Sequence, residues 1–201
     1  MPLPLAIDHA VIAVRDLDAA LASLRALGFT LTPRGYHSIG SQNHCIMLAS
    51  TYIELLVAPV AHPWLDYYRS FGEGLAAIAL STDDADATYT QLESKGARPP
   101  MDLSRPVEGG VAKFRLVLID GSPQVFFVQH LTRQFVWRAE WQRHANGARE
   151  LLHVSLSAKK PFGGLPKSIE WGASGELRIE GLKKDLASAG VALSRPRQQS
   201  R

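Results

Sequence analysis

Two side chains that can bind a metal or move a proton stand in otherwise apolar stretches of this sequence. His9 lies in "IDHAVIAV", residues 7–14, and Glu54 lies in "TYIELLVA", residues 51–58. Both stretches are typical of buried strands. An imidazole or a carboxylate there costs free energy unless it is hydrogen-bonded, paired or bound to a metal. The positions of His9 and Glu54 allow three interpretations: a ligand-binding pair, a buried His–Glu hydrogen bond, or an exposed strand edge.

Other polar groups accompany this pair. Alternation along a strand puts Tyr52 on the same face as Glu54, so both are expected to line the site. If His44, in "NHCIML", shares the face of His9, the three groups form a two-histidine, one-carboxylate set. Such a set suits Fe, Mn, Ni or Zn and leaves positions open for substrate. His37, in "GYHSIGSQN", is the alternative third group, or a residue at the pocket entrance.

Further candidates concern substrate rather than metal. Asn43 and Ser41 could orient a substrate oxygen, although both residue types are ordinary in turns. Arg115, in "AKFRLVLI", could bind a carboxylate or phosphate with its guanidinium fork. Because Lys113 shares its face, that face could equally be the solvated one. Arg105, in "DLSRP", is a weaker second cation for the same role.

The elements that would position these groups occur twice along the chain. The stretch "DHAVIAVRDLDAALASLRALGF" is echoed by "GLAAIALSTDDADATYTQLESKGA". Each has an apolar run, acidic residues that can start a helix, an amphipathic stretch and a glycine that can end it. Three strand candidates follow each helix, the first of them near residues 30–38 and 98–106. A turn signal, "DGSP", separates the last two strands of the second unit.

The sequence therefore predicts an α+β protein built from two tandem βαβββ modules. They span residues 1–61 and 74–132, and residues 62–73 form a linker that predicts one short helix. Residues 133–201 are expected to be a C-terminal extension. It would hold a partial strand–helix repeat, "ELRIEGLKKDLASAGVA", and a basic tail, "SRPRQQSR".

Composition limits the setting and the partners. The chain has 201 residues, 46% of them hydrophobic, with one cysteine and a net charge of +3. No apolar run is long enough to span a membrane, and the N-terminus lacks the features of a secretory signal. We expect a cytoplasmic protein that binds a small molecule. We expect no membrane and no nucleic acid as partners, since the basic tail lacks interleaved aromatic residues.

Six segments in order carry a resemblance to a known family over about residues 6–155. They are "DHAVIAVRDLDAA", "HSIGSQNHCIML", "YIELL", "GEGLAAIALSTDDADA", "FFVQH" and "HANGA". Together they resemble the glyoxalase-like domain group of the vicinal oxygen chelate superfamily. The resemblance implies paired modules that form a half-open cup around a divalent metal. The metal's ligands would be a histidine from the first strand and a glutamate from the fourth strand of each module.

For this chain the resemblance implies that His9 and Glu54 bind the metal, with His44 or His37 completing the site. The metal would act as a Lewis acid on a small oxygenated metabolite, and Glu54 could also move a proton. Lyase, isomerase and dioxygenase chemistry all stay open.

The second module departs from the family pattern. The position matching His9 is Leu75, and the position matching Glu54 falls in Phe126–Phe127. None of these side chains binds a metal, which favours an alternative function, a metal-free protein that binds or sequesters a small molecule. A third alternative is a scaffold whose cup is filled by side chains. Superfamily members often pair modules between chains, so a homodimer also stays open.

Overall fold

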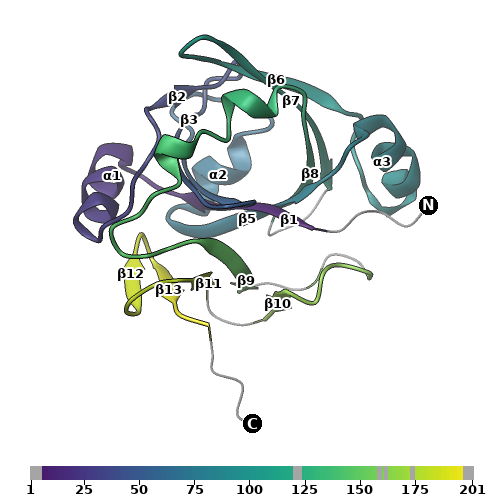
Figure 1. Ribbon diagram of the computed structural model, residues 1–201. Helices are drawn as coiled ribbons and strands as arrows, with labels where there is room; N and C mark the ends of the chain where they lie inside the picture. The colour runs from purple at the N-terminus through teal and green to yellow at the C-terminus, as the bar shows by residue number, and fades with distance from the viewer. Residues whose placement is uncertain (1–5, 120–123, 158–159, 161–162, 173–174, 197–201) are drawn as a thin grey trace.

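The fold is a strongly curved sheet with a second, smaller sheet beneath it (Figure 1). This computed structural model describes residues 6–119, 124–157, 160, 163–172 and 175–196. The "DGSP" turn at 120–123 and the end of the basic tail lie outside these residues. None of the described helices is long and apolar enough to cross a membrane.

Both predicted modules are present in the order expected. The first contains β1 (Ile7–Ala13), α1 (Leu17–Ala26), β2 (Gly35–Tyr36), β3 (Gln42–Met47) and β4 (Tyr52–Val57). The second contains β5 (Gly74–Ser81), α3 (Ala85–Leu92), β6 (Met101–Val107), β7 (Gly110–Ile119) and β8 (Gln124–His130). The short helix α2 (Asp66–Phe71) lies in the linker. The strand expected near residues 30–38 is only two residues long.

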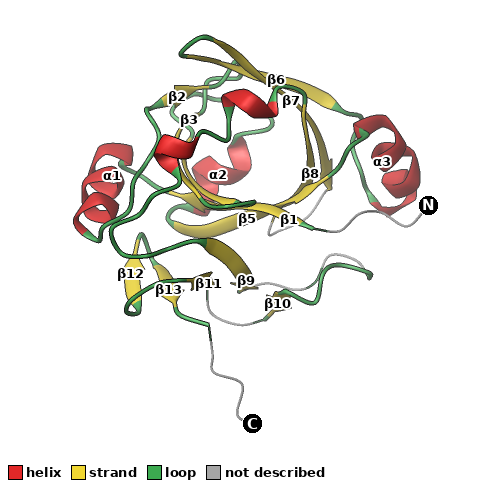
Figure 2. Cartoon of the chain, in the orientation of Figure 1, coloured by secondary structure: helices red, strands yellow, loops and turns green. Residues whose placement is uncertain are grey.

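The two module helices begin in the way their sequences predict. The Asp16 carboxylate accepts hydrogen bonds from the backbone N–H groups of Asp18 and Ala19, and α1 starts at Leu17. The Asp84 carboxylate accepts from the backbone N–H of Ala87 at the start of α3. These contacts satisfy N–H groups that a helix leaves free at its first turn. Figure 2 shows α1 and α3 on opposite outer sides of the curved sheet.

The modules join edge to edge at their first strands. Within the described residues the large sheet has eight strands in the order β2-β3-β4-β1-β5-β8-β7-β6, and β1 pairs antiparallel with β5. Its two outer ends also meet, because Ser38 N donates to Ser104 O at 2.8 Å and Ser104 N donates to Ser38 Oγ at 3.2 Å. The sheet therefore curves into the expected cup, which is nearly closed.

Apolar residues pack on both faces of this sheet. On the outer face, Ile12 and Ile78 belong to one buried cluster with the helices and the C-terminal sheet. On the inner face, Val11 and Ala77 belong to a second cluster, which includes Leu65 and Tyr68 beside α2. Because alternate residues of one strand face the two clusters, β1 and β5 form a wall between the cup and the lower sheet.

The C-terminal extension corrects one expectation. Its described residues form a separate five-stranded sheet of β9 (Glu150–Leu156), β10 (Ile169–Trp171), β11 (Glu176–Glu180), β12 (Leu186–Ser188) and β13 (Val191–Ser194). The predicted helix ending at Gly190 is wrong, since that stretch forms strands. Gly181, with φ of 84°, ends β11 where the chain passes close to Gly147. The two short 3-10 helices Arg133–Phe135 and Ala139–Trp141 connect β8 to this sheet.

Candidate functional site

A cavity opens inside the cup and holds about 690 Å³ of empty space, including its opening. Its walls differ in character. One wall is polar and is lined by residues of β1, β3, β4, β6 and the loop between β2 and β3: His9, His37, Ser41, Asn43, Cys45, Tyr52, Glu54 and Arg105. The other wall is apolar and is lined mainly by residues of the second module and the α2 region: Trp64, Leu65, Tyr68, Leu103, Phe114, Leu116, Leu118, Phe126 and Val128.

The His9 ring is held on three sides. Its face stacks on Tyr52 of β4, with ring centroids 4.1 Å apart, and Phe126 meets it edge-on at 5.4 Å. Its Nδ1 lies 2.7 Å from Asp8 Oδ1. The remaining nitrogen, Nε2, lies 3.6 Å from Glu54 Oε2. One nitrogen is therefore fixed by a carboxylate within the strand, and the other faces the second predicted site residue.

Asp8 is a site residue that the sequence analysis missed. A bulge in β1 leaves Asp8 without a partner on β5, so its buried carboxylate reaches the His9 ring. It also lies 3.1 Å from Nε2 of His130, a residue absent from the site predicted from sequence. Burial alone would raise the pKa of Asp8, but hydrogen bonds from His130 and His9 hold that pKa well below its usual range. An ionised Asp8 only accepts, so both histidines donate to it.

Glu54 is oriented by a neighbour on the adjacent strand. Asn43 Nδ2 donates to Glu54 Oε1 at 2.6 Å, and Asn43 is 3% exposed. This leaves Oε2 turned towards His9. Asn43 Oδ1 is buried and has no hydrogen-bond partner among the described residues. Asn43 therefore positions the carboxylate and keeps a free acceptor at the polar wall, and its predicted contact with substrate stays a prediction.

Three further groups of the polar wall, His37, Cys45 and Tyr52, are uncharged at neutral pH. Burial lowers the pKa of His37 to about 4, and its Nδ1 lies 2.9 Å from Ser41 Oγ. Burial raises the pKa of Cys45 to about 12 and lifts that of Tyr52 well above its ordinary value. His37 lines the cavity as expected, although no hydrogen bond or ion pair between described residues joins its side chain to His9 or Glu54.

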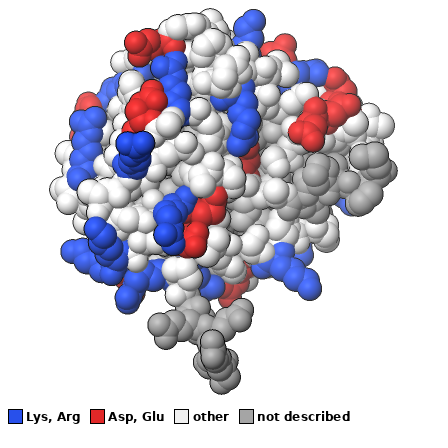
Figure 3. Space-filling view, viewed as in Figure 1, with Lys and Arg blue, Asp and Glu red and all other residues white. Residues whose placement is uncertain are grey.

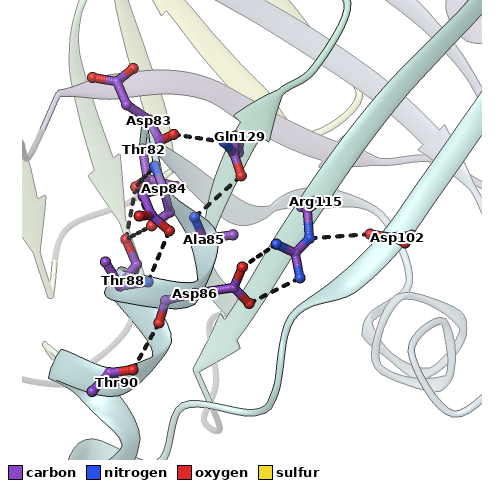
Figure 4. A network of polar contacts seen from close by, with 11 residues as sticks. Thr82, Asp83, Asp84, Ala85, Asp86, Thr88, Thr90, Asp102, Arg115 and Gln129 are labelled. Carbon is purple, nitrogen blue, oxygen red and sulfur yellow. Dashed lines mark hydrogen bonds and ion pairs between the residues drawn. The ribbon is translucent and has the colours of Figure 1, made fainter.

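Arg105 is the cation that the structure places in the cavity. It lies on β6 opposite Ala112 of β7 and is only 5% exposed. Arg115, the cation expected there first, faces the other side of the same sheet. Phe114 and Leu116 face the cup, so Arg115 between them points towards α3. There it forms ion pairs with Asp86 and Asp102 (Figure 4). Its predicted contact with substrate is therefore wrong.

His44 also fails to reach the cavity. It lies on β3 between Asn43 and Cys45, which both line the cup, so its side chain takes the opposite face. Its Nδ1 donates to Thr32 O at 2.8 Å. The set of His9, His44 and Glu54 predicted from sequence is therefore not brought together.

The residues of the second module that face His9 also differ from those expected. Ala79 of β5 lies opposite His9, and Phe126 of β8 pairs with Ala79. A bulge in β5 turns Leu75 to the outer face, where Phe127 also packs. On the cup face this module presents Ala79 and Phe126, whose side chains cannot bind a metal, whereas Leu75 and Phe127 face outward.

The comparisons now bear on a defined site. The sequence profile described as "Glyoxalase-like domain" matches residues 7–162. The chain belongs to this family. A search of curated proteins finds no match. The family assignment confirms the resemblance to the vicinal oxygen chelate superfamily.

Solved structures share the fold at low sequence identity. A hypothetical protein from Staphylococcus aureus has a TM-score of 0.70 at 16% identity, over 94% of this chain and 98% of that chain. A mutant of 4-hydroxymandelate synthase from Streptomyces coelicolor has a TM-score of 0.50 at 15% identity, over 96% of this chain and 62% of that chain. At these identities the likeness concerns the fold of this glyoxalase-like protein.

Members of the superfamily commonly use a divalent metal, so the donors present here need a direct test. In the described part of the cup His9 Nε2 and the Glu54 carboxylate converge, and the facing strands offer Ala79 and Phe126. Among the described residues no three His, Cys, Asp or Glu side chains are grouped to hold a metal. A catalytic zinc site takes three protein ligands. The donors of this glyoxalase-like protein therefore do not fit a resident metal of that kind.

Proposed function

We propose that this glyoxalase-like protein binds a small oxygenated molecule in its cup and moves a proton on it with His9 and Glu54. The observation that carries the proposal is the line Asp8–His9–Glu54, in which Nδ1 is bonded at 2.7 Å and Nε2 lies 3.6 Å from a carboxylate oxygen. General acid–base groups must lie within reach of the reacting group, and both line the cavity.

Each group in this line has a separate task. Ionised Asp8 accepts the hydrogen bond from His9 Nδ1 and so leaves Nε2 as the nitrogen that faces Glu54. His9 and Glu54 can share one proton between Nε2 and Oε2, and either can exchange it with a bound molecule. Asn43 fixes the other oxygen of Glu54, and Tyr52 fixes the plane of the His9 ring. Groups held in this way need little rearrangement before a proton moves.

The apolar wall supports the same proposal. Aromatic and aliphatic side chains of β7 and β8 border the polar wall and reduce the water around it. Electrostatic interactions strengthen in such surroundings. A small molecule could therefore place its reacting carbon beside Glu54 and its apolar part against Phe114 and Leu116.

The test is solvent exchange on small carbonyl compounds. A panel of aldehydes, ketones and 2-oxo acids with a C–H bond beside the carbonyl would be incubated with the protein in deuterated buffer and followed by proton NMR. We expect deuterium to enter at least one compound. We expect the rate to fall at least about 100-fold in Glu54→Gln and in His9→Gln, the usual contribution of a general acid or base.

His153→Gln is the matched control, because His153 lies on β9 outside the cavity and bonds Glu170. Its rate should equal that of the native protein. The proposal fails if no compound exchanges, or if exchange persists in Glu54→Gln. Binding of a panel compound without exchange would favour the second candidate, a metal-free binding protein, which the apolar wall and the missing third ligand support.

A further inference from the structure

Arg105 occupies a place that the fold keeps open for it. Its strand, β6, lies at one end of the large sheet and meets the loop after β2 at the other end. A Cβ atom at Gly35 of β2 would lie 3.0 Å from Arg105 Cδ and 3.2 Å from Arg105 Nη1, and it would overlap Asn43 Oδ1. The missing side chain at Gly35 therefore lets Arg105 and Asn43 lie against β2 at the polar wall.

The guanidinium of Arg105 lacks the partner that buried charges usually have. Its Nε is buried without a hydrogen-bond partner, and no carboxylate of the described residues lies within 4.0 Å of its nitrogens. Arg34 and Arg115, each less buried, bind Asp18 and Asp86 respectively. An arginine stays charged in proteins and has five N–H donors. A buried charge without a partner is costly, which indicates that an anion from outside the chain completes the site.

We propose that Arg105 binds the carboxylate of the molecule in the cup, and so that this molecule is a small carboxylic acid with an apolar body. The proposal rests on the cup being the substrate site, as proposed above. It adds the chemical class of the ligand and the residue that selects it. An arginine fork matches the two oxygens of a carboxylate, and a nonpolar enclosure strengthens each bond.

The charges around the cavity favour a carboxylate over a phosphate. Among the described lining residues Arg105 is the only Lys or Arg, and Glu54 borders the same space. A phosphate monoester carries close to two negative charges at neutral pH. One cation would leave such a group under-neutralised beside a glutamate, whereas a carboxylate carries a single charge.

The opposite wall indicates the rest of the molecule. Leu103 shares the cup face of β6 with Arg105, and Phe114, Leu116 and Phe126 line the space beyond it. A pocket of this composition favours an aryl or branched alkyl body. The reacting part of the acid would then lie between the apolar wall and the pair His9–Glu54.

Binding of phenylacetate, compared with phenylacetamide of nearly the same shape, tests this proposal. Isothermal titration of the full chain at pH 7 should show phenylacetate binding at least tenfold more tightly than the amide. Arg105→Met should weaken the acid at least tenfold and abolish its advantage over the amide. Arg105→Lys, which keeps the charge without the fork, should fall between. The matched control Arg115→Met, on the adjacent strand but outside the cavity, should bind both as the native protein does.

Several results would overturn the proposal. The proposal is overturned if the native protein binds phenylacetate and phenylacetamide equally well, or if it does not bind phenylacetate at millimolar concentration. Unchanged affinity in a folded Arg105→Met would overturn it as well. Displacement by equimolar inorganic phosphate would identify a general anion site instead.

Glu54→Gln separates this proposal from the one above. It should still bind phenylacetate, because it removes the proton-transfer group and leaves the cation. Retained binding together with lost exchange would support both proposals. Retained binding by a native protein that exchanges no compound would support the carboxylate site alone.

Discussion

The two modules place the same backbone elements around the cavity but give it opposite chemistry. β1 and β4 turn His9 and Glu54 into the cup, whereas β5 and β8 turn Ala79 and Phe126 into it. On the outer face the modules remain alike, since aliphatic or aromatic residues of both are fully buried there. The outer face must pack against helices and the lower sheet, so its residue types are constrained. The cup face borders a cavity, so its residues can differ without loss of the fold.

The largest expected effect on stability distinguishes the outer face of β8 from its cup face. Phe127→Ala, at a side chain with 0% exposure on the outer face, should lower the free energy of unfolding by about 3–5 kcal/mol. Phe126→Ala should cost clearly less, because Phe126 already borders empty space. Urea unfolding of both variants measures the difference. Equal costs would contradict the division of the strand into a packed face and a cavity face.

A somewhat smaller loss of stability is expected when Asp8 is replaced, because its carboxylate accepts hydrogen bonds from two histidines. Asp8→Asn should lower the free energy of unfolding at pH 7 by about 2–4 kcal/mol, because an amide cannot satisfy both donors in the same geometry. The folded-state pKa of Asp8 is lowered, so its contribution is present above about pH 4, the ordinary pKa of an aspartate, and is lost as pH falls below it.

Stability curves between pH 7 and pH 2 should therefore converge for the native protein and Asp8→Asn. Asp86→Asn, at an exposed carboxylate of the second module, should show no measurable change at pH 7. Curves that stay parallel down to pH 2 would show that the two histidines do not hold Asp8 ionised.

The smallest stability effect concerns His37. Burial lowers its pKa to about 4, so the unfolded chain binds the extra proton first as pH falls. The free energy of unfolding should therefore decrease between about pH 6.5 and pH 4, by about 2 kcal/mol when partial solvent exposure is allowed for. His37→Asn should remove that part of the pH dependence while the loss due to Asp8 remains. A His37 imidazole that titrates near pH 6.5 by NMR would contradict the assignment.

The repeat made most of the fold predictable from sequence, because apolar alternation and helix-capping aspartates are local signals. The second-module strands, the linker helix α2 and the pair His9–Glu54 followed from such signals. The C-terminal sheet did not, since its strand β12 lies in a stretch with the residue composition of a helix. Contacts across the molecule decide its conformation there.

The candidate site was less predictable because small shifts in register decide which side chains share a face. One extra residue in β1 brings Asp8 beside His9, and one in β5 turns Leu75 outward. Periodicity did not reveal either bulge.

The exchange of roles between Arg115 and Arg105 follows from closure of the sheet, which brings β6 against the loop after β2. The sequence did hold a signal for the orientation of Arg115. Its neighbours Phe114 and Leu116 are apolar and share the face that lines the cup, so Arg115 between them takes the opposite face.

We propose that the polar wall of the first module moves a proton with the chain's own residues. The most direct measurement is the deuterium exchange rate of the native protein after treatment with a chelator, compared with the same protein supplied with Mn, Fe, Ni or Zn and analysed for bound metal. We predict the same rate in both, with no stoichiometric metal. Loss of exchange on chelation, restored by one equivalent of a metal that His9→Ala and Glu54→Ala fail to bind, would show instead that His9 and Glu54 act through a bound metal.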